Sequence, residues 1–142
     1  MEIIIMDIAV KDKKIAAKER ITDLIVLQRE LCSIFPEDEY NVFVFGSYPT
    51  VRFEYGKSDV DIAVYTDDLD LYKRIAVIIE EFFEDRGLKV DLFFIDISIP
   101  APVFLAPLRA QIQFTDYYPD KLRKFETECE KELNKIKRSI AI

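Results

Sequence analysis

The sequence predicts an α/β fold in which a small mixed sheet has helices packed on one face and an open second face that carries carboxylates. Three short runs rich in β-branched and aromatic residues are typical of strands, at residues 42–45, 60–64 and 90–94. Segments with helical spacing flank and separate these runs. A sheet covered on both faces would not tolerate aspartates along its strands, so we expect one face to be open.

The first expected helix spans about residues 13–35 and covers one side of the sheet. It ends at Pro36, because proline cannot continue a helix. Its expected inner positions follow three- and four-residue spacing: Ile21, Leu24, Ile25, Gln28, Leu31, Ile34 and Phe35.

The first strand ends at Gly46 and Ser47, where the chain must turn. Glycine lets a phosphate approach the backbone closely, and the hydroxyl and amide of Ser47 are hydrogen-bond donors. A glycine-serine pair is by itself a weak signal, equally typical of an ordinary turn.

Paired carboxylates lie on the second strand. Asp59 and Asp61 share one face because side chains alternate along a strand. Two carboxylates this close repel each other unless a cation lies between them. If the third strand pairs beside the second, Asp91 joins them with its apolar neighbours turned to the core. The chain has no histidine, and its cysteines lie in helical segments away from these strands, so any metal here must be held by oxygen ligands. A site of a few carboxylates predicts Mg²⁺, with Mn²⁺ as a substitute.

The second expected helix follows Asp67 and Asp68, which suit a helix N-terminus, and stops at Gly87. Its expected buried positions are Leu71, Ile75, Ile78, Ile79 and Phe82. Prolines break the chain after the third strand, and a short helix is expected within residues 104–114. The C-terminal helix, about residues 119–140, has an apolar seam that packs on its own domain or forms a partner surface. The seam comprises Leu122, Phe125, Cys129, Leu133, Ile136 and Ile140.

The order of Gly-Ser, spacer, Asp-x-Asp, helix and Asp-bearing strand resembles the DNA polymerase β-like nucleotidyltransferase superfamily. The resemblance covers about residues 42–96, and the short length resembles the minimal nucleotidyltransferases. It implies the nucleotidyltransferase fold. It also implies that the nucleotide phosphates are bound by small residues of the turn after the first strand and by the serine directly before the Asp-x-Asp pair. These candidate nucleotide-binding residues are Gly46, Ser47 and Ser58.

The same resemblance implies roles for the aspartates. Asp59 and Asp61 hold Mg²⁺, while Asp91 helps to bind the metal and can accept the proton of the attacking hydroxyl. The implied reaction moves a nucleoside monophosphate to an acceptor hydroxyl. The expected donor is ATP, which supplies AMP, with another nucleoside triphosphate as the alternative.

Minimal nucleotidyltransferases commonly pair with a helical HEPN protein as a toxin-antitoxin module, and the resemblance implies such a partner here. One alternative is a small-molecule nucleotidyltransferase of the antibiotic-modifying type that acts as a homodimer. The other is an inactive member that binds its partner through the C-terminal helix.

The loop 48–58 departs from the family pattern. It is one residue longer than usual, and Tyr48-Pro49-Thr50 stands where the minimal enzymes often have Ala-Arg-Gly. Arg52 and Lys57 are therefore the alternatives for a basic contact to phosphate. The loop's aromatic residues, Tyr48, Phe53 and Tyr55, either stack on the nucleotide base or pack against their own domain.

Length and composition indicate one globular nucleotidyltransferase domain over residues 1–142, with its core at about 40–96. The net charge is −7 and no basic stripe is present outside the C-terminal segment, which disfavours nucleic acid as the acceptor. No leader or membrane-spanning segment is recognised, and Cys32 and Cys129 are expected to be buried and unpaired, so we expect a cytoplasmic protein.

Overall fold

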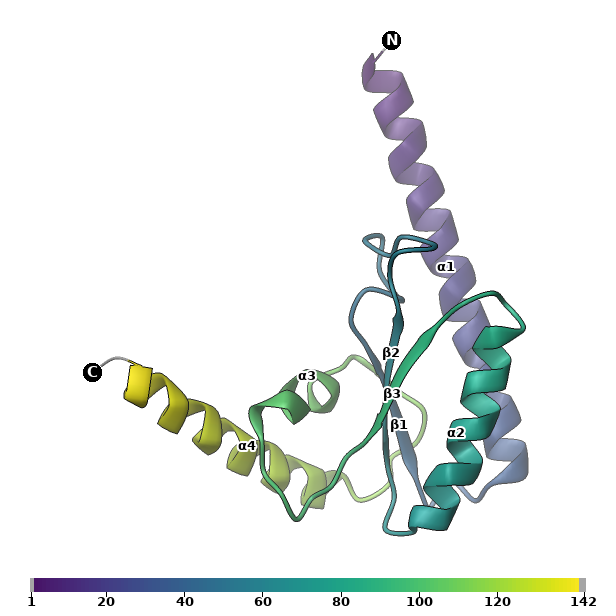
Figure 1. Cartoon of the computed structure of the whole chain (residues 1–142). Coiled ribbons are helices and arrows are strands. Elements are labelled where there is room, and N and C mark those ends of the chain that lie inside the picture. The colour runs from purple at the N-terminus through teal and green to yellow at the C-terminus, as the bar shows by residue number, and fades with distance from the viewer. Residues whose placement is uncertain (1, 141–142) are drawn as a thin grey trace.

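The computed structural model describes residues 2–140, with side chains from residue 10 onward (Figure 1). The elements follow in the order α1 (Glu2–Ile34), β1 (Asn41–Phe45), β2 (Val60–Tyr65), α2 (Leu69–Glu84), β3 (Val90–Phe94), the 3₁₀ turn η1 (Pro102–Phe104), α3 (Leu105–Leu108), β4 (Ile112–Gln113) and α4 (Pro119–Ile140). The three predicted strands and the mixed α/β class are confirmed. The two-residue strand β4 was not predicted.

The described strands form a four-stranded sheet in the order β3-β2-β1-β4. β1 runs antiparallel to both of its neighbours, whereas β2 and β3 are parallel and α2 connects them. The last residues of β1 and the first residues of β2 and β3 therefore meet at the same end of the sheet. The register there pairs Phe45 with Asp61, and Asp61 with Asp91.

Helices α1 and α2 cover one face of the sheet (Figure 1). Strand residues of one parity point toward them and are fully buried: Val42, Val44, Val60, Ile62 and Val64. The helices contribute Leu24, Leu27, Leu31, Ile75, Ile79 and Phe83 to the same core. Burying apolar side chains from two strands and two helices in this way is the main source of the fold's stability.

The expectation that the carboxylate-bearing face is open is only partly correct. A second core lies on this face, where the turn η1, α3 and α4 cover Phe43, Ala63 and Tyr65. The physical reason is that this face is acidic only where β2 and β3 begin. The residues of the same parity further along, including Phe93, are apolar and need cover. The aspartates thus lie at an open end of a face that is otherwise buried.

The first helix differs from its prediction in length and in buried face. It begins at Glu2 rather than near residue 13. Its buried positions are Ala17, Arg20, Leu24, Leu27 and Leu31, and the predicted Phe35 is buried directly after its end. The predicted inner residues Ile21, Ile25 and Ile34 are exposed. Apolar residues occur on more than one side of this helix, so spacing alone did not select the buried side.

The other two long helices agree better with their predictions. Asp68 caps α2 by accepting hydrogen bonds from the amides of Asp70 and Leu71, and the expected apolar stripe packs into the core. In α4, Leu122, Phe125 and Cys129 are buried, but Ile136 and Ile140 are 48% and 79% exposed. The first half of α4 packs on its own domain, and its C-terminal half projects beyond the sheet, as does the N-terminal part of α1 (Figure 1).

Both cysteines are unpaired. Cys129 is buried as predicted, while Cys32 is half-buried and accepts a hydrogen bond from the Tyr40 hydroxyl at 3.4 Å. Among the described helices, none combines the length and apolar character that crossing a bilayer requires.

Candidate active site

Three aspartates lie at the open end of the sheet. β2 and β3 are parallel and in register, so Asp61 and Asp91 are direct neighbours on one face. Asp59 precedes Asp61 by two residues and shares its face. Asp61 is half-buried, whereas the other two are exposed. The prediction that the third strand pairs beside the second is confirmed.

The aspartates influence one another electrostatically. Burial raises the pKa of Asp61 above its ordinary value, and the negative charges of Asp91 and then Asp59 raise it further. Within residues 10–140, no group of three or more Asp, Glu or Cys side chains is gathered closely enough to hold a metal ion, and this includes the three aspartates as they stand. The donor set nevertheless fits Mg²⁺, which prefers carboxylate oxygens and keeps positions for water and phosphate.

Gly46 lies directly against Asp61. Its φ of +73° is in the left-handed region, which side chains disfavour. A Cβ at this position would overlap Oδ2 of Asp61 and lie 3.0 Å from Cγ. The turn and the carboxylate are therefore in contact only because residue 46 has no side chain.

The chain after Gly46 forms a tight turn. The Ser47 carbonyl accepts hydrogen bonds from the amide and the hydroxyl of Thr50, both at 2.8 Å. Because a peptide's C=O and N–H point in opposite directions, the Tyr48 amide faces away from this turn. The amide of Ser47 has no acceptor among the described residues and Ser47 is partly exposed, so this amide remains available to bind an anion. Tyr48 is fully buried, so its amide is not accessible to a ligand.

Arg20 of α1 holds this loop, and the sequence interpretation missed it. The residue is buried, and its guanidinium donates to the carbonyls of Tyr48 and Thr50 at 2.7 Å each. Tyr48 and Phe53 are buried and packed edge to face, which resolves the alternatives for these two in favour of packing within the domain. The signal for Arg20 was its spacing: it lies three residues after Ala17 and four before Leu24, both buried.

The remaining candidates of the loop have local contacts. The Ser58 hydroxyl accepts a hydrogen bond from the Glu54 amide at 3.1 Å and closes the turn before Asp59. Lys57 forms an exposed ion pair with Glu54 at 3.7 Å. Arg52 lines a cavity between α1 and the loop, together with Lys13 and Lys14. Their predicted contacts with phosphate stay predictions.

Lys89 is a second residue that sequence reasoning missed. Its carbonyl accepts a hydrogen bond from the Val60 amide at 2.8 Å, which places Lys89 beside Asp59 in the register. Strand alternation puts its side chain on the face of Asp91. The signal was available in the sequence, because Lys89 and Asp91 are two residues apart.

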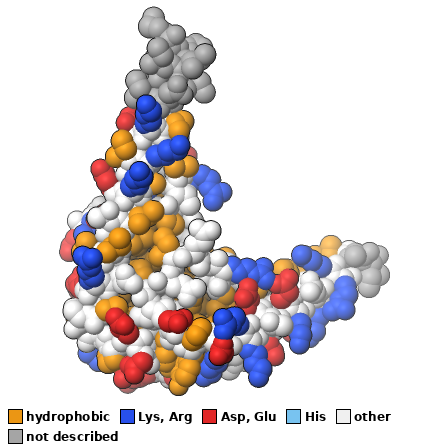
Figure 2. All heavy atoms as spheres, turned by 180° about the vertical axis from the view of Figure 1, so that it is seen from behind, with side chains coloured by type: hydrophobic (Ala, Val, Ile, Leu, Met, Phe, Trp, Pro, Cys, Tyr) orange, Lys and Arg blue, Asp and Glu red, His pale blue; other side chains and the backbone are white. Residues whose placement is uncertain are grey.

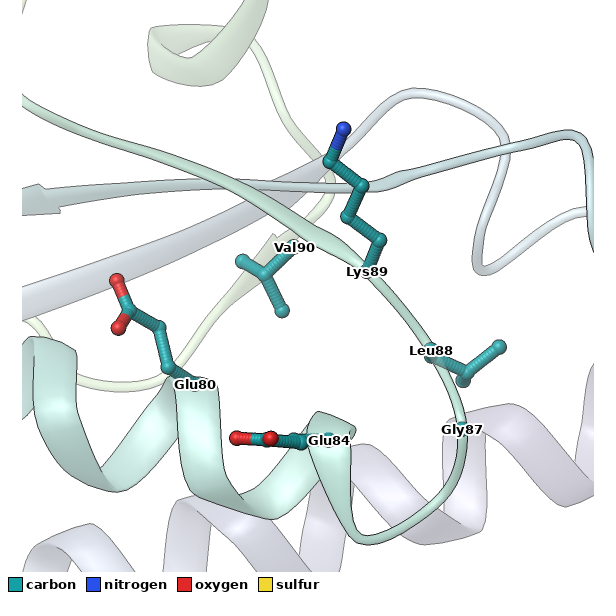
Figure 3. Close-up of a pocket in the computed structure, with 6 residues that line it drawn as sticks. All are labelled: Glu80, Glu84, Gly87, Leu88, Lys89 and Val90. Carbon is teal, nitrogen blue, oxygen red and sulfur yellow. The ribbon is translucent and has the colours of Figure 1, made fainter.

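Figure 3 shows the other side of this segment, where a cavity of about 400 Å³ lies between the end of α2 and the start of β3. Glu80 and Glu84 extend from α2 toward the cavity, while Lys89 points away from them (Figure 3). The predicted site residues do not line this cavity, so it is separate from the candidate site.

A groove of about 560 Å³ adjoins Gly46 at the β4 edge of the sheet. Its lining is mainly apolar and comes from α1, β1, the loop and the segment before β4: Ile21, Val44, Phe45, Gly46, Pro49, Thr50, Ala106, Ala110, Gln111 and Ile112. Figure 2 shows apolar side chains gathered on the face seen from behind, below the lysine-bearing part of α1. The groove's volume is within the range of small-molecule sites.

Comparison with known proteins gave one match. The family model described as a nucleotidyltransferase domain matches residues 24–139. The matched segment contains the Gly46 turn and all three aspartates, and it extends well beyond the resemblance over residues 42–96. Neither the curated proteins nor the solved structures gave a significant match.

Proposed function

The chain belongs to the nucleotidyltransferase domain family and is a nucleotidyltransferase, and we propose that it transfers AMP from ATP, in an Mg²⁺-dependent reaction, to a hydroxyl of a protein partner. We also propose that residues 1–142 constitute one nucleotidyltransferase domain. The observation that carries the proposal is the convergence of Asp61 with both Asp91 and Gly46. It places a carboxylate pair directly beside a turn that presents the unbonded amide of Ser47.

In the proposed mechanism, Asp59, Asp61 and Asp91 hold the metal. A bound Mg²⁺ would supply neutralisation of charge on the phosphates and orientation of the attacking oxygen. Burial raises the pKa of Asp61, and the negative charges of Asp91 and Asp59 raise it further; a cation would relieve this repulsion among the carboxylates. The relief of this repulsion therefore contributes favourably to the free energy of metal binding.

The proton of the acceptor hydroxyl goes to Asp91. This residue is exposed on the edge strand, where an acceptor can approach, whereas Asp61 is half-buried against Gly46. No histidine is present to take this role. The turn at Gly46 and the amide and hydroxyl of Ser47 bind the β- and γ-phosphates and stabilise pyrophosphate as it leaves.

We propose a HEPN-type helical protein as the acceptor, in a toxin-antitoxin pair. The apolar groove beside Gly46 supports a protein partner, because it offers an apolar contact surface at the β4 edge, across the sheet from Asp91. The exposed Ile136 and Ile140 on the projecting half of α4 add an apolar surface for such a partner.

Thermal unfolding with ATP, Mg²⁺ or both tests the nucleotide site. A ligand that binds only the folded state at a hundredfold excess over its Kd stabilises by about 2.7 kcal/mol. We expect the pair of ligands to stabilise the wild-type chain but neither Asp61→Asn nor Asp91→Asn. Asp38→Asn, an exposed charge-matched control in the turn before β1, should respond like the wild type. An equal response from all four proteins would contradict the carboxylate site.

The acceptor is tested by incubating the chain, Mg·ATP and a co-expressed HEPN-type protein, followed by intact-mass measurement. We expect the partner to gain the mass of AMP, and the Asp61→Asn enzyme to leave it unmodified. Modification of an aminoglycoside, with the HEPN-type protein unchanged and the chain dimeric, would favour the small-molecule alternative instead.

A further inference from the structure

Arg20 is a buried cation, and the side chains of residues 10–140 provide it with no acidic partner. Its side chain belongs to α1 and is 3% exposed. No carboxylate within residues 10–140 lies within ion-pair distance of its guanidinium. A buried charge is costly unless other groups compensate it, so the surroundings of Arg20 must be organised to do so.

Two carbonyls and three aromatic rings provide that compensation. Nε donates to the Tyr48 carbonyl and Nη2 to the Thr50 carbonyl, both at 2.7 Å, and Nη1 donates to the Tyr55 hydroxyl at 3.2 Å. The guanidinium carbon also lies over the rings of Phe53, Tyr55 and Tyr48, at 4.9, 5.4 and 5.9 Å from their centroids. All of these partners belong to the loop that follows Gly46.

The hydrogen bonds fix peptide orientations where phosphate is expected. With the Thr50 carbonyl directed at Arg20, the Val51 amide must point the opposite way. The Tyr48 carbonyl is followed by Pro49, which has no N–H, so Arg20 satisfies this peptide without using a donor of the turn. Arg20 therefore binds the loop on the side that faces α1, and it does so through carbonyls, without using an N–H group of the turn.

We propose that Arg20 is a positioning residue for the nucleotide, which holds the Gly46–Thr50 turn in the shape that binds the triphosphate. The inference rests on the proposed function of this turn. Arg20 lies before the residues 24–139 that match the family model, so the support comes from outside the matched segment. The loop it holds is the one that is longer than the family pattern, and a longer loop has more conformational freedom to restrict.

Arg20→Met tests the inference, because methionine keeps much of the length and apolar contact but donates no hydrogen bond. Arg86→Met is the control: Arg86, just after α2, also stacks on a ring, 3.5 Å from the centroid of Phe82, and donates to a backbone carbonyl at 3.0 Å. It also forms an ion pair with Asp23 of α1 at 3.8 Å, so its loss disturbs α1 close to Arg20 without removing a hydrogen bond to the loop. Arg20→Lys should give intermediate results, since an ammonium cannot reproduce the fork of a guanidinium.

Two measurements are made on each full-length protein. Hydrogen exchange reports the protection of amides 47–58 against that of β2 and β3, and titration with Mg·ATP and with adenosine reports affinity. We expect Arg20→Met to accelerate exchange in the loop alone and to weaken Mg·ATP binding about tenfold, the scale of a lost charge-assisted hydrogen bond. Binding of adenosine, which has no phosphate, should change little, and Arg86→Met should match the wild type in the loop and in affinity.

The outcomes separate this inference from the proposed function. Unchanged loop exchange in a folded Arg20→Met protein overturns the inference, and so does a looser loop that binds Mg·ATP as tightly as the wild type. If the wild type itself binds no Mg·ATP, the proposed function fails and Arg20 is only a loop anchor. Should Arg20→Met not fold, Tyr55→Phe removes the Nη1 contact at an exposed position, and wild-type behaviour of both Tyr55→Phe and Arg20→Lys would overturn the inference.

Discussion

The carboxylate of Asp61 occupies the position that a Cβ of residue 46 would take if Gly46 had a side chain. The two residues come from the end of β1 and the start of β2, where Phe45 pairs with Asp61. The antiparallel register therefore sets the contact, and glycine makes it possible. Any side chain at position 46 must move the carboxylate that faces Asp91.

We expect Gly46→Ala to destabilise the fold and to abolish most of the nucleotide binding. The left-handed backbone costs about 1–2 kcal/mol for a residue with a Cβ, and displacement of Asp61 adds to it. Gly87→Ala is the matched control, with a φ of +70° and no atom within 4 Å of where an alanine Cβ would lie, so it should show the backbone cost alone. Denaturant unfolding and Mg·ATP affinity measure the two effects. Equal losses in both variants would mean that the contact with Asp61 is unimportant.

Asp61→Asn should raise stability at neutral pH while it removes metal binding. Because the pKa of Asp61 is raised, the folded chain holds this proton more tightly than the unfolded chain. Stability therefore falls as pH rises from the ordinary pKa through the raised one, and asparagine avoids this loss. Melting temperatures across this pH range should show a gain at neutral pH that disappears in acid.

Asp96→Asn provides a control of opposite sign. Hydrogen bonds from the hydroxyl and the amide of Ser98 lower the pKa of Asp96. Its carboxylate contributes stability above the ordinary pKa that is lost as pH falls through the lowered value. We expect this variant to be less stable than the wild type at neutral pH and to converge with it in acid. Parallel pH profiles for the two variants would contradict the assignment.

Lys89→Met should weaken Mg·ATP binding about twofold to fivefold, the scale of an exposed charge interaction. Lys89 lies beside Asp59 on the carboxylate face, where its charge attracts phosphate. Added salt should weaken binding less in the variant than in the wild type, because screening then removes less attraction. Lys73→Met, on the exposed side of α2, is the charge-matched control and should bind normally. Identical affinity and salt dependence in both variants would remove Lys89 from the site.

Tyr48→Phe should leave stability unchanged or raise it by about 1 kcal/mol, because the buried Tyr48 hydroxyl has no hydrogen-bond partner among the described residues. Tyr40 is equally buried, but its hydroxyl donates to the Cys32 sulfur at 3.4 Å. Tyr40→Phe should therefore lose about 0.5–1.5 kcal/mol. Denaturant midpoints compare the two substitutions, and a larger loss for Tyr48→Phe would reveal a partner for its hydroxyl.

Strand alternation was sufficient to predict that Asp59 and Asp61 share a face, whereas the place of Asp91 was predicted only on the condition that the third strand pairs beside the second. A period of two places Asp59 and Asp61 on one face, and the βαβ connection through α2 brings Asp91 beside them. Capping by Asp68 and the apolar stripe of α2 were predictable for the same reason, since both are local patterns. The two-residue period of the strands and the short connection through α2 thus determine the relative positions of the three aspartates.

Long-range pairing explains what was missed. β4 has two residues, too few for a pattern, and it pairs with β1 across about seventy positions of the chain. The cover over Ala63 depends on the same distant segment. Arg20 looked like part of a charged outer face, and only the folded loop reveals that the helix turns it inward.

The place of β3 at the edge of the sheet has a consequence for self-association. Its sequence from Val90 to Phe94 is apolar except for Asp91, and an edge strand of this composition can pair with the same strand of another molecule. Asp91 puts a negative charge near the start of that edge, so pairing two copies in register would bring like charges together. The residue proposed to accept the proton is therefore also the one that discourages edge-to-edge aggregation, and an apolar replacement would endanger solubility together with catalysis.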